Sequence, residues 1–215
     1  MIEAVIFDMD GTLIDSEPMW KNAEKEVFSS LGVNVSDELA LQSATMTTIE
    51  AAAFWFNQSP WHGPSIEQVA QAVVTRVAEL ITHRGKALEG VHSTLKLLKD
   101  NQIKIGLATN APAQLIPIVL DTLDISHYFS DCRSSDDELA GKPDPAIYLT
   151  AAQGLDVCPS RCLAIEDSST GILAAKAAKM RTLAVPHKGE YEHQKFDLSD
   201  FKLRSLTDFN LSYLV

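Results

Sequence analysis

The sequence predicts an α/β fold: a doubly wound parallel sheet carrying a small inserted α-helical domain. Short apolar runs bounded by turn residues recur along the 215 residues, as expected for strands buried on both faces of a sheet. Helical segments alternate with these runs, which favours right-handed βαβ units. A gap of about 95 residues separates the first two runs, and this is far more than one crossover needs.

The strands of this sheet are expected where the apolar runs are shortest and best bounded. Pro186 closes the last of these runs. The expected strands are Val5–Phe7, Ile103–Ala108, Cys162–Ile165 and Thr182–Val185. The tail, residues 190–215, is expected to add a final strand and a surface wrap without chemistry of its own.

Four helices are expected to connect the strands, over residues 91–101, 113–123, 146–155 and 171–180. Pro112 suits the first position of the second helix, while Pro117 should kink or shorten it. The last helix is rich in alanine, a strong helix former.

The inserted domain is expected over residues 16–86, leaving 1–15 and 87–215 as the core. Residues 19–31 and 66–83 have helical periodicity, and 36–56 have it weakly. A Pro- and Gly-containing stretch over 59–65 separates them.

Composition excludes several functional classes. At 46% apolar and 22% charged residues the chain is an ordinary globular protein, and its net charge of −11 disfavours nucleic acid. No apolar window is long enough for a membrane span, and the acidic N-terminal segment does not resemble a secretion signal. The three cysteines, Cys132, Cys158 and Cys162, are expected to be reduced and packed. We therefore expect a cytoplasmic protein, and a monomer.

The most informative motif is Asp8-Met9-Asp10-Gly11-Thr12, directly after the first strand. Ligands of open α/β sheets bind beyond the carboxyl ends of strands, and Gly11 permits a sharp bend there. Both acids can then face one cleft. The alternative is an acidic turn with a capping Asp, since acids and glycine are common in turns, but four such specified residues are not expected to occur together by chance.

A second acidic pair, Glu166-Asp167, follows the third expected strand. Adjacent strand ends would bring Asp8, Asp10 and Asp167 together, and like charges so close require a cation. Carboxylate oxygens suit Mg²⁺ better than zinc, and Mn²⁺ is expected to substitute. Taken alone, Glu166-Asp167 could instead be the acidic start of a helix.

Two further features could hold an anion. Thr109-Asn110 ends the second strand, and Lys142 lies between Gly141 and Pro143 in a rigid loop before a helix. Each has an ordinary alternative, since a Thr-Asn pair often only caps a helix and a loop lysine is usually solvated.

In this order, the four motifs resemble those of the haloacid-dehalogenase-like hydrolases over essentially the whole chain, with the insert similar to their helical cap. Asp15–Trp20 and Pro60–Pro64 are most similar to the bacterial sugar- and hexitol-phosphate phosphatases of the β-phosphoglucomutase-like branch. The resemblance implies an Mg²⁺-dependent phosphatase acting on a small phosphorylated metabolite.

The resemblance also implies a role for each motif residue. Asp8 would attack phosphorus and form an aspartyl-phosphate, while Asp10 would act as general acid and then base. Mg²⁺ would be held by Asp8, the Asp10 carbonyl and Asp167. Glu166 would either bind the ion directly or support its ligands, and Thr109, Asn110 and Lys142 would hold the phosphoryl oxygens.

Two other functions stay open at this point. A sugar phosphomutase would use the same core, but Trp20 occupies a position where β-phosphoglucomutases carry a histidine, which favours hydrolysis. A receiver-type phosphoacceptor module also combines acids, Thr, Lys and Mg²⁺. Receivers, however, carry an acid pair and not the nucleophile after the first strand, and they lack a long helical insert.

The expected substrates are hexose or hexitol 6-phosphates, such as 2-deoxyglucose 6-phosphate and sorbitol 6-phosphate. Thr45 and Thr47 replace a Gly and an Arg that such phosphatases often carry, which removes a bidentate donor. Glu17, Trp55 and Trp61 are candidate substrate-lining residues, although both tryptophans could simply pack inside the insert.

Overall fold

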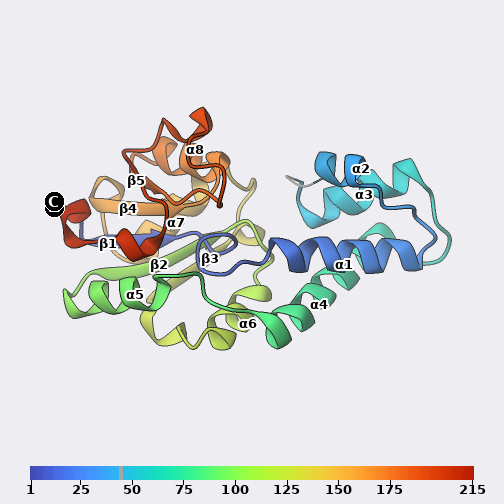
Figure 1. Ribbon diagram of the computed structural model, residues 1–215, viewed down its shortest axis with the longest axis horizontal. Helices are drawn as coiled ribbons and strands as arrows, with labels where there is room; N and C mark the ends of the chain where they lie inside the picture. The colour runs from blue at the N-terminus through green and yellow to red at the C-terminus, as the bar shows by residue number, and fades with distance from the viewer. Residues whose placement is uncertain (44–45) are drawn as a thin grey trace. The chain divides into compact units, whose positions relative to one another are not determined.

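The structure, a computed structural model, describes residues 1–43 and 46–215 (Figure 1). Its contacts divide the described chain into two compact units. Met1–Asp15 and Lys86–Val215 form one, here named the core unit, and Ser16–Gly85 forms the other, the helical unit.

A parallel sheet runs through the core unit, and its described strands lie in the order β3-β2-β1-β4-β5-β6. This arrangement confirms the predicted α/β class and doubly wound topology. The strands are β1 (Ala4–Phe7), β2 (Lys104–Thr109), β3 (Asp131–Ser134), β4 (Cys162–Glu166), β5 (Arg181–Ala184) and β6 (Phe201–Lys202).

β1 lies at the centre because all four of its residues are apolar and buried. Val5 pairs with Ile105 of β2 on one side and with Leu163 of β4 on the other. The chain builds outward from β1 to β3, then returns to the other side of β1 to start β4. The sheet therefore reverses its winding between β1 and β4, where ligands of open α/β sheets bind.

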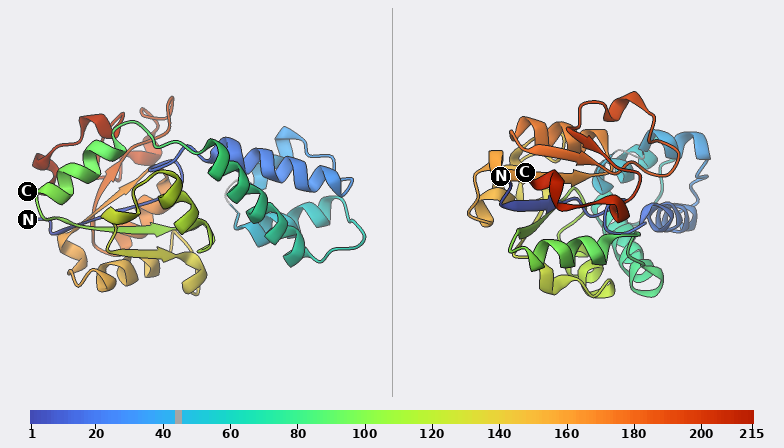
Figure 2. Two further views of the ribbon diagram at one scale, coloured as in Figure 1. Left: turned by 90° about the horizontal axis from the view of Figure 1, so that it is seen from below. Right: turned by 60° about the vertical axis from the view of Figure 1, so that its left-hand side comes forward.

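Helices cover both faces of the sheet (Figure 2). α5 (Val91–Asp100) and α6 (Leu115–Thr122) lie on one face, and α7 (Ala146–Gly154) and α8 (Ser169–Ala177) on the other, as right-handed crossovers require. Side chains alternate along β1, so Ala4 and Ile6 join the cluster formed with α7 and α8. Phe7 points the opposite way and contacts Phe129 edge-on.

Two local predictions for the core unit are wrong. β3 was not expected, because its sequence Asp131-Cys132-Arg133-Ser134 is polar, as suits a strand at the sheet edge. α6 begins at Leu115, and not at Pro112, because Pro117 lacks an N–H and is tolerated only in the first turn of a helix.

The C-terminal tail adds β6 to the sheet edge and continues in short 3₁₀ turns, as expected of a strand and surface wrap. Its Leu214 carbonyl accepts a hydrogen bond from the Ile2 backbone N–H at 2.9 Å.

All three cysteines are free thiols, but only Cys162 is fully buried and Cys158 is exposed, so the prediction of packing is wrong for Cys158. No helix in the described part of the chain could cross a membrane.

The helical unit consists, in its described residues, of α1 (Glu17–Ser30), α2 (Asp37–Ser43), α3 (Thr48–Gln58) and α4 (Ile66–Arg84). α4 packs along both α1 and α3. The weakly periodic region 36–56 thus contains two helices. Thr47 begins the second as its N-cap, accepting from the Glu50 N–H at 3.4 Å. Thr45 lies outside the described residues.

Candidate active site

Several predicted site residues gather at the carboxyl ends of three neighbouring strands of the core unit. Asp8 directly follows β1, Thr109 is the last residue of β2, and Glu166 is the last residue of β4. The Asp8 N–H donates to the Ile165 carbonyl at 2.9 Å, which continues the β1–β4 pairing up to the site. Strand order and register alone thus bring these residues, far apart in sequence, to one edge.

Lys142 is buried at the centre of this group, contrary to the usual expectation for a loop lysine. Among the described residues its ammonium donates to the Asp8 Oδ1 and Glu166 Oε1 atoms, each at 2.6 Å, and to the Ala108 carbonyl at 2.7 Å. An ammonium has three N–H donors, so these three bonds use them all. Lys142 is therefore fixed between two carboxylates and the end of β2.

Glu166 is wholly buried and its carboxylate is surrounded by protein donors. Oε1 accepts from Lys142 and, at 2.7 Å, from the Tyr148 hydroxyl. Oε2 accepts from the Ser168 hydroxyl at 2.8 Å and from the Ser168 N–H at 3.3 Å. A carboxylate has about four acceptor positions, and these four donors occupy them.

Asp167 brings a third carboxylate to the site. One oxygen each of Asp8, Glu166 and Asp167 lie within 4.8 Å of one another, which is close enough to share a metal ion. The Asp167 carboxylate reaches this place across Gly11, where a Cβ atom would lie 2.0 Å from Asp167 Oδ2. Gly11 also has a φ of +78°, so the bend predicted at this glycine is present.

The electrostatics of the cluster favour the binding of a cation. Burial raises the pKa of Asp8 to about 7, with Lys142 opposing the rise and Glu166 adding to it. Burial and the charges of Asp8 and Glu166 also raise the pKa of Asp167 well above its usual value. For Lys142, burial alone would lower the pKa, but the two carboxylates outweigh it and hold the pKa above its usual value. Three carboxylates thus share one ammonium, and a bound cation would relieve their repulsion.

Thr109 and Asn110 differ in what their side chains do. The buried Thr109 hydroxyl accepts from the Ala111 N–H at 3.0 Å, and it can still donate its own hydrogen to a ligand. The Asn110 amide is engaged with the backbone of Lys142, accepting from its N–H at 2.9 Å and donating to its carbonyl at 3.3 Å. In this structure the Asn110 side chain holds the loop that carries Lys142, and a contact of Asn110 with phosphate stays a prediction.

Asp10 lies in the turn after Asp8, partly exposed, and forms an isolated bridge with Ile14. Asp10 therefore lies two positions after Asp8, at the carboxyl end of the same strand, β1. A role for Asp10 in proton transfer, like the roles of the other motif residues, stays a prediction.

The predicted substrate-lining residues of the helical unit have other partners there. Glu17 is exposed in the first turn of α1 and forms an ion pair with Lys21 at 2.5 Å. Trp55 is wholly buried and Trp61 is 6% exposed, and both rings pack against Phe28. The two tryptophans therefore belong to the aromatic core of the helical unit, which is the alternative that the sequence left open.

Sequence reasoning missed two residues that contact the cluster, Tyr148 and Ser168. Ser168 is the N-cap of α8 and accepts from the Gly171 N–H at 3.0 Å while it donates to Glu166. A serine directly after an acidic pair and before an alanine-rich helix is a recognisable cap signal. Tyr148 lies in the first turn of the largely apolar helix α7, and nothing in its local sequence distinguishes it from a core residue.

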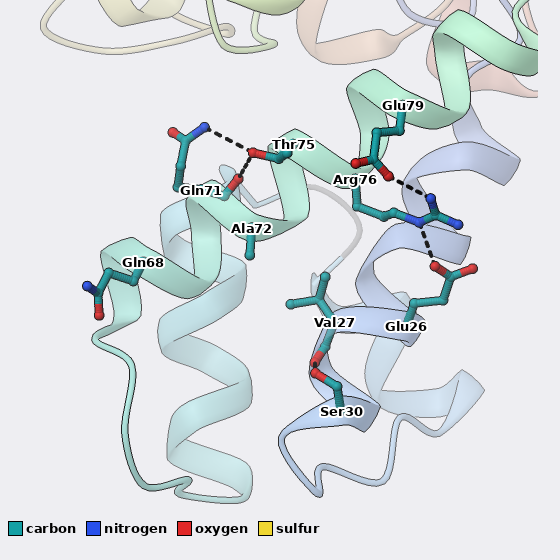
Figure 3. A pocket seen from close by; sticks show the side chains of 9 residues that line it. All are labelled: Glu26, Val27, Ser30, Gln68, Gln71, Ala72, Thr75, Arg76 and Glu79. Atoms are coloured by element: carbon teal, nitrogen blue, oxygen red, sulfur yellow. Dashed lines mark hydrogen bonds and ion pairs between the residues drawn. The ribbon is translucent and has the colours of Figure 1, made fainter.

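A groove between α1 and α4 is a second place where polar side chains gather (Figure 3). Its cation, Arg76, donates to Glu26 at 2.6 Å and to Glu79 at 2.7 Å, so its charge is already neutralised. The Thr75 hydroxyl donates to the Gln71 carbonyl within the same helix. The groove offers no unpaired charge for a phosphate among its described residues, unlike the cluster around Lys142.

Comparison with known families decides which class of protein this is. Residues 5–185 match the model of the haloacid dehalogenase-like hydrolase family. The chain belongs to this family. The match spans every motif residue from Asp8 to Asp167, and it confirms the family resemblance noted in the sequence.

Similar haloacid dehalogenase-like proteins include phosphatases. The chain is 38% identical to hexitol phosphatase B of Escherichia coli K12, over 100% of this chain and 97% of that protein. Among solved structures, CbbY from Rhodobacter sphaeroides in complex with phosphate has a TM-score of 0.87 at 28% identity, covering 97% of this chain and 96% of that one. β-Phosphoglucomutase from Clostridium difficile has a TM-score of 0.83 at 26% identity, covering 100% and 96%. The predicted enzyme class, a phosphoric monoester hydrolase, is confirmed at this level.

Proposed function

We propose that this enzyme hydrolyses small phosphate monoesters, hexose or hexitol 6-phosphates in particular, through an aspartyl-phosphate on Asp8. The observation that carries the proposal is the contact at 2.6 Å between the buried Lys142 ammonium and Asp8 Oδ1, with the carboxylate of Asp167 beside them. A nucleophile, a fixed positive charge and oxygen ligands for a cation thus lie together at the sheet's switch point.

In the first step one carboxylate oxygen of Asp8 forms a bond to phosphorus, and the bond from phosphorus to the substrate oxygen breaks. Asp10, protonated at the start, donates its proton to the departing alkoxide. In the second step Asp10 accepts a proton from water as that water attacks phosphorus. Inorganic phosphate leaves, and Asp8 returns to its carboxylate form.

Lys142 has to change partners during this cycle, because its three N–H donors are all engaged in the free enzyme. Once Asp8 carries a phosphoryl group, its oxygen loses negative charge and its bond to Lys142 weakens. We propose that Lys142 then exchanges Asp8 Oδ1 for a phosphoryl oxygen, and that the Thr109 hydroxyl donates to another. The Lys142 ammonium would therefore stabilise the negative charge on the phosphoryl oxygens during the transfer.

The donor set fits Mg²⁺, with Mn²⁺ able to substitute, because its atoms are carboxylate oxygens whose repulsion a cation would offset. Asp8 and Asp167 would hold the ion together with the Asp10 carbonyl. When bound, the ion would supply positive charge between nucleophile and phosphate. We propose that Glu166 is not among the ligands, although it lies within reach, because its acceptor positions are taken by Lys142, Tyr148 and Ser168.

The substrate class is proposed from the relatives and from the helical unit. Hexitol phosphatase B supports a sugar or polyol phosphate, and its similarity covers the full chain. A mutase is less favoured, since the indole of Trp20 cannot accept and release a proton at a position where β-phosphoglucomutases have histidine. The signalling-module alternative does not agree with membership of a hydrolase family. Glu17 stays a candidate for contacting substrate hydroxyls.

We further propose a cytoplasmic location and a monomeric state for the enzyme. The three cysteines are free, which supports a reducing compartment such as the cytoplasm.

The experiment that tests the function is an assay of phosphate release over a panel of phosphorylated sugars and polyols, with Mg²⁺ present. The wild-type enzyme should prefer hexose or hexitol 6-phosphates and form a hydroxylamine-labile phosphate adduct. Asp8→Asn should lose both turnover and adduct while staying folded. Asp100→Asn, which removes an exposed carboxylate paired with Lys96, is the matched control and should keep full activity. Equal rates on all monoesters would contradict the substrate class, and an active Asp8→Asn would contradict the nucleophile.

A further inference from the structure

We propose that Tyr148 is a positioning residue, whose hydroxyl holds Lys142 against Asp8 by fixing Glu166 between them. This inference rests on the proposed function, because it concerns the placement of the charge that would stabilise phosphoryl transfer. Its basis is a chain of buried contacts from Tyr148 to Glu166 to Lys142 to Asp8, each between 2.6 and 2.7 Å.

The Tyr148 side chain contacts both charges of the buried pair. It is wholly buried, and its hydroxyl donates to Glu166 Oε1, the same atom that accepts from Lys142. The Lys142 ammonium also lies 5.0 Å from the centre of the Tyr148 ring, which is within the range of a cation–π interaction. Burial and the charge of Glu166 hold the pKa of Tyr148 well above its usual value, so the hydroxyl keeps its hydrogen and donates.

Glu166 is fixed at its other oxygen as well. Ser168 donates to Oε2 twice, through its hydroxyl and its N–H, and Ser168 is itself held as the cap of α8. The carboxylate packs directly on Gly171, where a Cβ atom would lie 1.8 Å from Oε1. Three elements therefore restrain Glu166, and Tyr148 supplies the only hydroxyl among the described residues that restrains the oxygen facing Lys142.

Removing the Tyr148 hydroxyl should release this oxygen without disturbing the packing. In Tyr148→Phe the ring and its contact with the Lys142 ammonium are retained, while Glu166 Oε1 keeps Lys142 as its partner and can pivot about Ser168. Lys142 would then be less well placed when charge moves to the phosphoryl group. Tyr148 has no proposed contact with substrate, so the loss should lie in kcat and leave KM nearly unchanged.

The test is a comparison of steady-state kinetics for Tyr148→Phe and the wild-type enzyme on the best substrate of the panel. We expect kcat to fall about tenfold with KM within about twofold, since a hydrogen bond to a charged group typically has an effect of this size. Tyr191→Phe is the matched control, because its hydroxyl donates at 3.3 Å to the Lys202 carbonyl at the edge of the sheet. The control should keep the wild-type kcat.

A double-mutant cycle with Glu166→Gln tests whether Tyr148 acts through Glu166. In the Glu166→Gln background, Tyr148→Phe should lower kcat by less than about twofold, because the residue through which it acts is already altered. Independent, additive losses would overturn the proposal, and so would a Tyr148→Phe enzyme with wild-type kcat and only a lower melting temperature.

Failure of this inference can be told apart from failure of the proposed function. If the wild-type enzyme releases no phosphate from any ester, the proposed function is wrong. If the wild-type enzyme is active, Asp8→Asn is not, and Tyr148→Phe is as active as wild type, only the role of Tyr148 is wrong.

Discussion

The carboxylate of Asp167 lies directly against the α-carbon of Gly11, so that any side chain at position 11 would occupy the place of Asp167 Oδ2. A Cβ atom there would be 2.0 Å from that oxygen, and the backbone φ of +78° also disfavours other residues. The glycine of the first motif thus has a second purpose besides bending the chain. It leaves room for the acid of the fourth motif to approach Asp8.

We therefore expect Gly11→Ala to inactivate the enzyme by displacing Asp167. Its kcat/KM should fall at least about a hundredfold, because a displaced metal ligand affects the metal site and the nucleophile together. Gly32→Ala is the matched control, since Gly32 has a similar φ of +83° but no atom within 4 Å of the added Cβ. The control should lose about 1 kcal/mol of stability and no activity. If both variants are equally active, the contact between Gly11 and Asp167 has no functional role.

Loss of the buried ammonium should cost stability as well as activity. Lys142→Met leaves Asp8 and Glu166 facing each other without the charge that pairs them, so we expect the free energy of unfolding in EDTA to fall by about 3–5 kcal/mol. Urea unfolding measures this directly. Lys96→Met removes an exposed lysine paired with Asp100, and it should cost less than about 1 kcal/mol.

Removing the charge of one of the two carboxylates that lose Lys142 as their partner should restore part of that stability. In Lys142→Met combined with Glu166→Gln, only Asp8 of the original pair keeps its charge, so the double variant should be more stable than Lys142→Met alone. It should still be inactive, because the positive charge is missing. A double variant less stable than either single one would show that charge repulsion is not what destabilises Lys142→Met.

Binding of a divalent cation should be visible in stability, without any assay of turnover. A ligand that binds only the folded state raises the melting temperature, and the rise grows with the logarithm of its concentration above the dissociation constant. We expect Mg²⁺ or Mn²⁺ to raise it in the wild-type protein, EDTA to reverse the rise and abolish activity, and Asp167→Ala to remove the response. Glu166→Gln should keep the response, because Glu166 is proposed not to bind the ion. A response lost in Glu166→Gln but kept in Asp167→Ala would contradict the proposed ligand set.

The α/β class of the sheet and the residues at its carboxyl edge were predictable because both depend on short-range patterns. Val5–Phe7 is a buried apolar run, and the acids that follow it lie where the chain must leave the sheet. The same pattern recurs before Glu166. The edge strand Asp131–Ser134 escaped prediction because an edge strand need not be apolar.

The contacts of the site residues were not predictable from the sequence, because each depends on a partner far away along the chain. Lys142 is buried only because Asp8 and Glu166, 134 and 24 residues away, supply its counter-charges. The two hydrogen bonds of the Asn110 amide with the backbone of Lys142 join residues 32 positions apart, and no local pattern indicates them. Tyr148 resembles any buried helical residue until its hydroxyl is seen to reach Glu166.

Glu24 of α1 gives the helical unit a stability that depends on pH. Burial raises the pKa of this partly buried carboxyl from an ordinary value of 4.5 to about 7. Between these two values the folded protein holds a proton that the unfolded chain releases. The associated stability is therefore fully present below about pH 4.5 and is lost as the pH rises to about 7.

We expect Glu24→Gln to remove this pH dependence, because the amide does not ionise. The variant and the wild-type protein should unfold at similar urea concentrations at about pH 5, and the variant should be more stable by about 2 kcal/mol at about pH 8. Glu26→Gln provides a control of opposite sign, since the hydrogen bond from Arg76 lowers the pKa of Glu26 and its charge is stabilising at neutral pH. A Glu24→Gln protein whose stability follows the wild-type curve at both pH values would show that Glu24 is ionised in the folded state throughout.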